Sequence, residues 1–159
     1  MRRDIRKLIK WTLNQLGMYS EEAAELVYST GEAESGYRAL SQQGGPAIGF
    51  FQVEPNTLWD VWDNYVTYRP ELKSKLYALG FEEADAEIRV KGSIILQVAF
   101  CRLQYRRDKQ ALPDALDVNA QAKYWKRVYN TELGKGTITH FLNANKRPIH
   151  AQPVLRVGG

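Results

Sequence analysis

Glu34-Ser35-Gly36-Tyr37 and, after a short Gly/Pro loop, Gly49-Phe50-Phe51-Gln52-Val53-Glu54-Pro55-Asn56-Thr57 are the two stretches that decide the fold. They place one carboxylate near the end of a helix, then a tight backbone turn, an apolar pair, an amide and a second carboxylate. Cleavage of a glycosidic bond needs a proton donor in a dry setting beside a groove that binds sugar. The pattern therefore indicates a site of that chemical kind.

Glu34 has to be distinguished from its neighbour Glu32. The segment 20–35 is predicted to be a helix, with Ser20 as its N-cap and acidic residues in its first turn. Steps of three and four residues back from Glu34 reach the stripe expected to face the core: Ala23, Leu26, Val27 and Thr30.

Residues two apart on a helix are separated by about 200°, so Glu32 is expected to lie on the solvated face. Burial disfavours the charged form of a carboxyl, and we therefore predict a protonated Glu34 near neutral pH. The alternative is a buried Glu34 that is paired with an arginine such as Arg38.

The two stretches together resemble the soluble lytic transglycosylase-like and goose-type lysozyme group. The resemblance is closest to a subgroup encoded by tailed bacteriophages, and it covers roughly residues 20 to 142 through segments 43–55, 124–126, 129–131 and 134–137. It implies a mainly α, lysozyme-like domain with a short hairpin or an irregular groove wall around residues 40–53.

The resemblance also implies roles for individual residues. In that group the Glu of the Glu-Ser pair is the catalytic acid/base, which assigns this role to Glu34. The group's Gly-Leu-Met-Gln signature, here residues 49–52, forms part of the groove, and a Tyr-Asn pair follows the core helices. The implied substrate-binding residues are therefore Ser35, Gly49, Phe51, Gln52, Tyr129 and Asn130.

Glu54 departs from the transglycosylase pattern, which usually has a methionine there, whereas goose-type lysozymes have an aspartate. One interpretation makes Glu54 a second catalytic carboxylate that holds a nucleophilic water, as in an inverting muramidase. In the other, Glu34 acts alone as acid and then base, and a hydroxyl of the sugar closes an anhydro ring. Glu54 would then be a surface residue in a Pro-bearing turn.

Composition is that of one globular domain of 159 residues, with 44% hydrophobic and 25% charged residues. The net charge of +4 favours polyanionic partners such as cell-wall glycan with its peptide carboxylates, anionic lipid or nucleic acid. No nucleic-acid module signature is present.

The single cysteine, Cys101, excludes an internal disulfide, and His140 and His150 have no partner at ligand spacing. We expect neither metal nor cofactor.

We expect a lysozyme-like domain over residues 1–145 and an extended C-terminal tail over 146–159 that is a candidate docking segment for other virion proteins. Ile5, Leu8, Ile9, Leu13 and Leu16 recur at helical spacing, so the N-terminal helix is expected to pack on the domain, with a membrane-surface role as the alternative. Neither a secretion signal nor a membrane span is expected. Helices are predicted near 4–17, 21–36, 55–68, 70–79, 82–108, 114–130 and 136–144.

Three functional hypotheses follow. The first is a phage enzyme, carried in the virion or released from the host cytoplasm, that cleaves the β-1,4 bond between N-acetylmuramic acid and N-acetylglucosamine in peptidoglycan glycan strands. It would act as a lytic transglycosylase or a lysozyme (muramidase). The second is a non-catalytic virion structural or glycan-binding protein with the same fold. The third is a basic protein that binds nucleic acid or a membrane surface.

Overall fold

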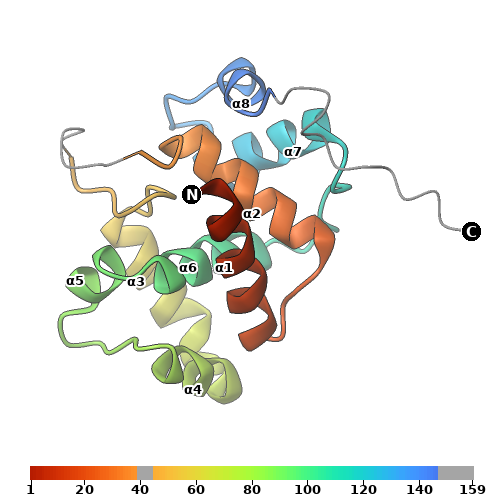
Figure 1. Ribbon diagram of the computed structural model, residues 1–159. Coiled ribbons are helices and arrows are strands. Elements are labelled where there is room, and N and C mark those ends of the chain that lie inside the picture. The colour runs from red at the N-terminus through yellow and green to blue at the C-terminus, as the bar shows by residue number, and fades with distance from the viewer. Residues whose placement is uncertain (39–44, 147–159) are drawn as a thin grey trace, which may run out of the picture.

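The computed structural model describes residues 1–38 and 45–146, which form a mainly helical domain without a β-strand in those ranges (Figure 1). A 3-10 turn, Val66–Tyr68, and a π-helical segment, Trp125–Asn130, accompany the α-helices. The α-helices are α1 Arg2–Gln15, α2 Glu21–Glu34, α3 Pro55–Asn64, α4 Pro70–Ala78, α5 Ala86–Lys91, α6 Ile94–Arg106, α7 Val118–Tyr124 and α8 Ile138–Ala144. The prediction of a mainly α protein is confirmed.

Helix α6 is the centre of the domain. It contacts α1, α2, α3, α5 and the π-helical segment, and a helix that is apolar on nearly every side is expected to be enclosed in this way. Its residues from Leu96 to Leu103 are all buried, among them Val98, Ala99, Phe100 and Cys101 at 0% exposure. Burial raises the pKa of the Cys101 thiol and so favours its neutral, unreactive form.

Helices α1 and α2 pack on α6 and on each other (Figure 1). Ile5, Ile9, Leu13 and Leu16 are each no more than 5% exposed, so the N-terminal helix packs on the domain through its apolar stripe, as predicted. Ser20 begins α2, because its Oγ accepts a hydrogen bond from the backbone N–H of Ala23 at 3.0 Å. The predicted N-cap is therefore confirmed.

The predicted single helix over 82–108 is wrong. The chain instead forms α5 and α6, which are separated at Gly92 and Ser93. Ser93 has extended backbone angles, and its side chain accepts a hydrogen bond from the backbone N–H of Leu96 at 3.2 Å. This N-cap starts a new helix where apolar periodicity alone predicted continuity.

Two other predicted helices have different limits. The helix predicted over 114–130 begins at Val118, where Asp117 caps it by accepting from the N–H of Ala120 at 2.9 Å, and its last part is the π-helical segment. The helix predicted over 55–68 ends at Asn64.

No helix of the described residues combines the length and apolar character needed to cross a membrane.

The groove wall predicted around residues 40–53 falls partly outside the described residues, which exclude 39–44. The described part is a tight turn closed by an antiparallel bridge between Ile48 and Val53, with N···O distances of 2.8 and 3.1 Å. The predicted tail 146–159 lies, apart from Lys146, outside the described residues as well.

Gly49 is required in this turn for two reasons. Its φ is +72°, and a Cβ at this position would lie 2.2 Å from the side chain of Gln97. The Gln97 amide is buried; its Oε1 accepts from the N–H of Phe50 at 3.0 Å, and its Nε2 donates to the carbonyls of Val90 and Lys91. The glycine therefore leaves room for the Gln97 side chain of α6, which joins the turn by its hydrogen bond with Phe50 and joins the end of α5 by the other two.

We predict that Gly49→Ala lowers the free energy of unfolding by about 3 kcal/mol, because it combines a strained φ with displacement of a buried amide. Gly17→Ala is the matched control: Gly17 has a φ of +67°, but a Cβ there would meet only the end of the flexible Lys75 side chain. Its expected cost is about 1 kcal/mol. Urea unfolding of both variants measures the difference, and equal costs would contradict the role given to Gln97.

Candidate active site

Glu34 is the last residue of α2, and its carboxyl is partly buried. The indole Nε1–H of Trp125, from the π-helical segment, donates a hydrogen bond to Glu34 Oε1 at 3.1 Å. Glu34 forms no ion pair with any residue in the described ranges. The structure therefore does not support the alternative in which a buried Glu34 is paired with an arginine.

Burial raises the pKa of the Glu34 carboxyl from its ordinary value of 4.5 to about 7. The hydrogen bond from Trp125 and the positive charge of His140 oppose this shift, since both favour the ionised form, whereas the negative charge of Glu54 adds to it. Because desolvation outweighs the opposing effects, a large fraction of the molecules carry a proton on Glu34 at neutral pH. This is the protonation state that the sequence predicts.

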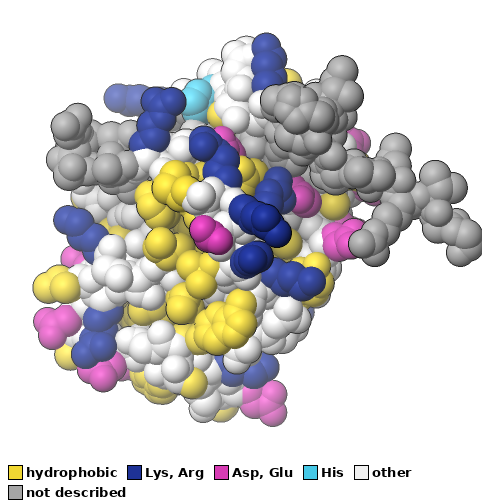
Figure 2. Space-filling model, in the orientation of Figure 1, with side chains coloured by type: hydrophobic (Ala, Val, Ile, Leu, Met, Phe, Trp, Pro, Cys, Tyr) yellow, Lys and Arg dark blue, Asp and Glu magenta, His cyan; other side chains and the backbone are white. Residues whose placement is uncertain are grey.

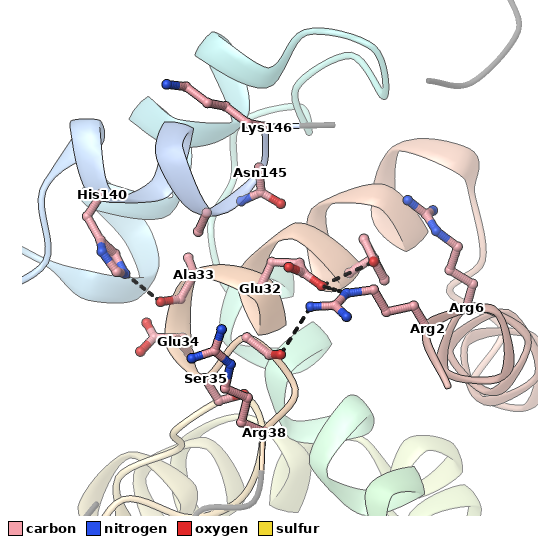
Figure 3. A pocket seen from close by; sticks show the side chains of 13 residues that line it. Arg2, Arg6, Glu32, Ala33, Glu34, Ser35, Arg38, His140, Asn145 and Lys146 are labelled. Atoms are coloured by element: carbon pink, nitrogen blue, oxygen red, sulfur yellow. Dashed lines mark hydrogen bonds and ion pairs between the residues drawn. The ribbon is translucent and has the colours of Figure 1, made fainter. Parts of the chain in front are cut away.

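Glu32 differs from the prediction that placed it on a solvated face. Its side chain is only 12% exposed, and it accepts hydrogen bonds from Arg2 Nε at 2.6 Å and from the Tyr28 hydroxyl at 3.2 Å. Helix α1 packs beside this face of α2 and brings Arg2 to it. Figure 3 shows the two carboxylates on different sides of α2, so the predicted divergence of Glu32 and Glu34 holds.

A cavity of about 750 Å³ lies at the carboxyl end of α2, between that end, α1 and α8 (Figure 3). Two carboxylates line it, Glu32 and Glu34, together with four cationic side chains: Arg2, Arg6, Arg38 and Lys146. Arg2 and Arg6 are ion-paired to Glu32 and Glu25. Arg38 and Lys146 form no ion pair within the part of the chain that the structure describes, so the cavity carries excess positive charge.

The wall opposite α2 is fixed by α8. An imidazole nitrogen of His140 lies 2.6 Å from the carbonyl oxygen of Ala33, which ties α8 to the last turn of α2 (Figure 3). The Trp125 ring packs on Phe141 with 5.3 Å between ring centroids, and both side chains are buried. These contacts hold the indole N–H in place against Glu34.

The turn 48–53 is joined to the π-helical segment by one hydrogen bond. The Tyr129 hydroxyl donates to the backbone carbonyl of Phe51 at 2.6 Å, and the Tyr129 ring stacks on Tyr105 of α6. Gln52 has a φ of +51°, and its side-chain amide donates to the carbonyl of Gly49 at 2.9 Å. Unusual backbone of this kind, like a π-helical turn, is concentrated at functional sites.

Two of the predicted substrate-binding side chains have other roles. Phe51 is 0% exposed and packs edge-on against Tyr37, so its ring is part of the core in this structure, and a substrate-binding role for this residue stays a prediction. An apolar ring beside the core gains more from burial than from solvent contact. Ser35 lines the cavity, but its hydroxyl accepts from the N–H of Tyr37 at 3.1 Å and donates to the Gly31 carbonyl at 3.3 Å.

The Tyr-Asn pair borders a second groove and a loop. Tyr129 lines a groove of about 430 Å³ together with Thr57 and Gln104. The side-chain oxygen of Asn130 accepts from Lys126 Nζ at 2.7 Å, and Asn130 lies so close to Gly134 that a Cβ there would be 2.5 Å from that oxygen. Neither Tyr129 nor Asn130 lines the cavity at Glu34.

Glu54 is exposed at the start of α3, next to Pro55, and its side chain makes no capping hydrogen bond. Its charge is nevertheless close enough to contribute to the raised pKa of Glu34. A second carboxylate therefore stands within electrostatic range of the first. The described residues contain no group of three or more His, Cys, Asp or Glu side chains placed to hold a metal ion.

Sequence reasoning missed Trp125 and His140 as parts of this site. Trp125 precedes Tyr129 by four residues, a spacing that places both on one side of a helix and could have suggested a shared role. His140 gives no such signal, because its contact with Ala33 bridges residues that are far apart in the sequence.

We predict that Glu34→Gln stabilises the protein at pH 8 but not at pH 4. The unfolded carboxyl ionises near 4.5 and the folded one near 7, so wild-type stability falls as pH rises through this window. At about 1.4 kcal/mol per pKa unit, the variant gains about 3 kcal/mol above pH 7. Urea unfolding across pH 4–8 measures it, and a pH-independent difference would contradict the raised pKa.

Comparison of the chain with protein-family models, with curated proteins and with solved structures gives no match. The geometry of the site therefore carries the functional argument.

Proposed function

We propose that the protein is a peptidoglycan-cleaving enzyme with a lysozyme-like helical fold, acting on the β-1,4 bond between N-acetylmuramic acid and N-acetylglucosamine. The observation that carries the proposal is Glu34, a partly buried carboxyl whose pKa is raised to about 7 beside a cavity of about 750 Å³. A general acid works best when its pKa lies near the working pH. The resemblance of segments 34–37 and 49–57 to lytic transglycosylases and goose-type lysozymes supports the same reaction.

In the proposed reaction Glu34 gives its proton to the bridging glycosidic oxygen as the bond to the sugar carbon breaks. The sugar left behind carries positive charge, which the new Glu34 carboxylate stabilises. In a lytic transglycosylase, the hydroxyl of that same sugar then attacks the carbon, and Glu34 takes up its proton. In a muramidase, a water attacks instead and loses its proton to a base, for which Glu54 is the candidate.

Charge supports a peptidoglycan substrate over a neutral glycan. Arg38 and Lys146 line the cavity and form no ion pair in the described part of the chain. Peptidoglycan carries carboxylates on the peptides attached to its muramic acid residues, and these would be attracted to the two cations. The phage-type resemblance further suggests an enzyme that belongs to a virion or is released in an infected host.

A non-catalytic virion structural or glycan-binding protein with the same fold is the alternative. Burial of Phe51 and Tyr37 favours the structural version of this alternative, since these rings lie in the core and are not available to stack on sugars. A structural or binding protein, however, has no need for a carboxyl that burial keeps protonated at a cost in stability. We therefore prefer the catalytic proposal.

We predict that the wild-type protein clears a zymogram of purified cell-wall sacculi and that Glu34→Gln lowers the rate by about 10² to 10⁴. Glu32→Gln is the matched control, because it removes the neighbouring carboxylate of the same cavity, and it should retain most activity. The wild-type rate should fall about tenfold per pH unit above pH 7, as Glu34 loses its proton. Equal clearing by wild type and Glu34→Gln would exclude Glu34 as the acid.

Mass spectrometry of the released fragments distinguishes the two chemistries. Anhydro-muramic ends identify a transglycosylase, and reducing ends identify a hydrolase. If Glu54 activates water, Glu54→Gln should abolish the reducing-end product while leaving the fold intact. Unchanged products and rate would place Glu54 outside the reaction.

A further inference from the structure

The outward face of α1 combines cations with an exposed aromatic ring. Arg3, Lys7, Lys10 and Trp11 follow one another at helical spacing, so they share one face of the helix. The opposite face is the apolar stripe that packs on the domain. All four outward residues are exposed, and Trp11 is 46% exposed, whereas Trp62 and Trp125 are at most 3% exposed.

The charges on this helix divide into two sets. Arg2 and Arg6 point toward α2, where they pair with Glu32 and Glu25. Arg3, Lys7 and Lys10 form no ion pair with any residue of the described ranges. The acidic residue of α1, Asp4, has a carboxylate oxygen 4.0 Å from the amino group of Met1.

Tyr19 extends the aromatic part of this surface. It follows α1, its side chain is 37% exposed, and Lys10 Nζ lies 5.5 Å from its ring centroid. Figure 2 shows Lys and Arg side chains gathered over α1, with hydrophobic side chains beside them. The surface is thus both cationic and aromatic, which is uncommon for a solvated helix face.

We propose that this α1 face, made of Arg3, Lys7, Lys10, Trp11 and Tyr19, docks on an anionic lipid bilayer. Lysine and arginine attract anionic headgroups, and indole and phenol rings favour the interface between water and hydrocarbon. A soluble polyanion would account for the three cations but not for the exposed rings. The apolar stripe stays packed on the domain, so the helix adsorbs through its outer face only and does not insert.

The docking face is separate from the cavity at Glu34, which Arg2 and Arg6 line from another side of α1. The proposal is therefore independent of the proposed reaction. Glu34→Gln should bind vesicles as well as the wild type does, whatever its effect on glycan cleavage.

Vesicle flotation tests the proposal with the full chain. The wild type should bind vesicles of phosphatidylglycerol and phosphatidylethanolamine at low salt, bind pure phosphatidylcholine far less, and be released as salt rises. Each lysine near a membrane surface contributes about fivefold to partitioning, so Lys7→Gln/Lys10→Gln should bind about 25-fold more weakly. The matched control, Lys91→Gln/Lys123→Gln, loses the same charge from α5 and α7 and should bind within about twofold of the wild type.

Brominated lipids test the orientation. They quench tryptophans near the hydrocarbon, so they should quench part of the wild-type emission, and Trp11→Phe should remove the quenched part. Equal weakening by the two double variants, absence of quenching, or binding to heparin but not to vesicles would overturn the proposal. The last result would assign the face to a soluble polyanion instead.

Discussion

Removal of the Glu34 carboxyl from water at the end of α2 is the interaction on which the rest of this site depends. Desolvation raises its pKa to about 7, although the indole of Trp125 and the charge of His140 favour ionisation. A carboxyl that met an arginine here would instead be held ionised and could not donate a proton. The absence of such a partner in the described residues is thus as important as the burial itself.

The surrounding elements keep that environment in place. Helix α8 is tied to α2 through His140 and Ala33, and Phe141 supports the indole that contacts Glu34. The turn 48–53 is held by two hydrogen bonds from other elements: the N–H of Phe50 donates to Gln97 of α6, and the Tyr129 hydroxyl donates to the carbonyl of Phe51. Several residues of the signature that resembles a substrate-binding motif, residues 49–52 and Tyr129, therefore have structural contacts here. They hold the turn 48–53 against α6 and the π-helical segment.

Local sequence patterns are sufficient to predict those features of the fold that depend on residues close together in the sequence. Apolar spacing predicted the buried stripe of α1, and Ser20 predicted the start of α2. The same reasoning missed the break at Gly92 and the cap at Ser93, although a glycine followed by a serine is a local signal for the end of one helix and the start of the next. Burial of Phe51 and the ion pair of Glu32 could not be predicted, since each depends on a helix or ring that is distant in sequence.

A carbon-13 NMR titration of the glutamate side-chain carboxyls, with Glu34→Gln to assign the signal, tests the central claim most directly. The account predicts that the Glu34 carboxyl titrates with a midpoint near 7 in the folded protein. A midpoint near the ordinary value of 4.5 would show that water or a cation reaches the carboxylate, and would contradict its role as a proton donor.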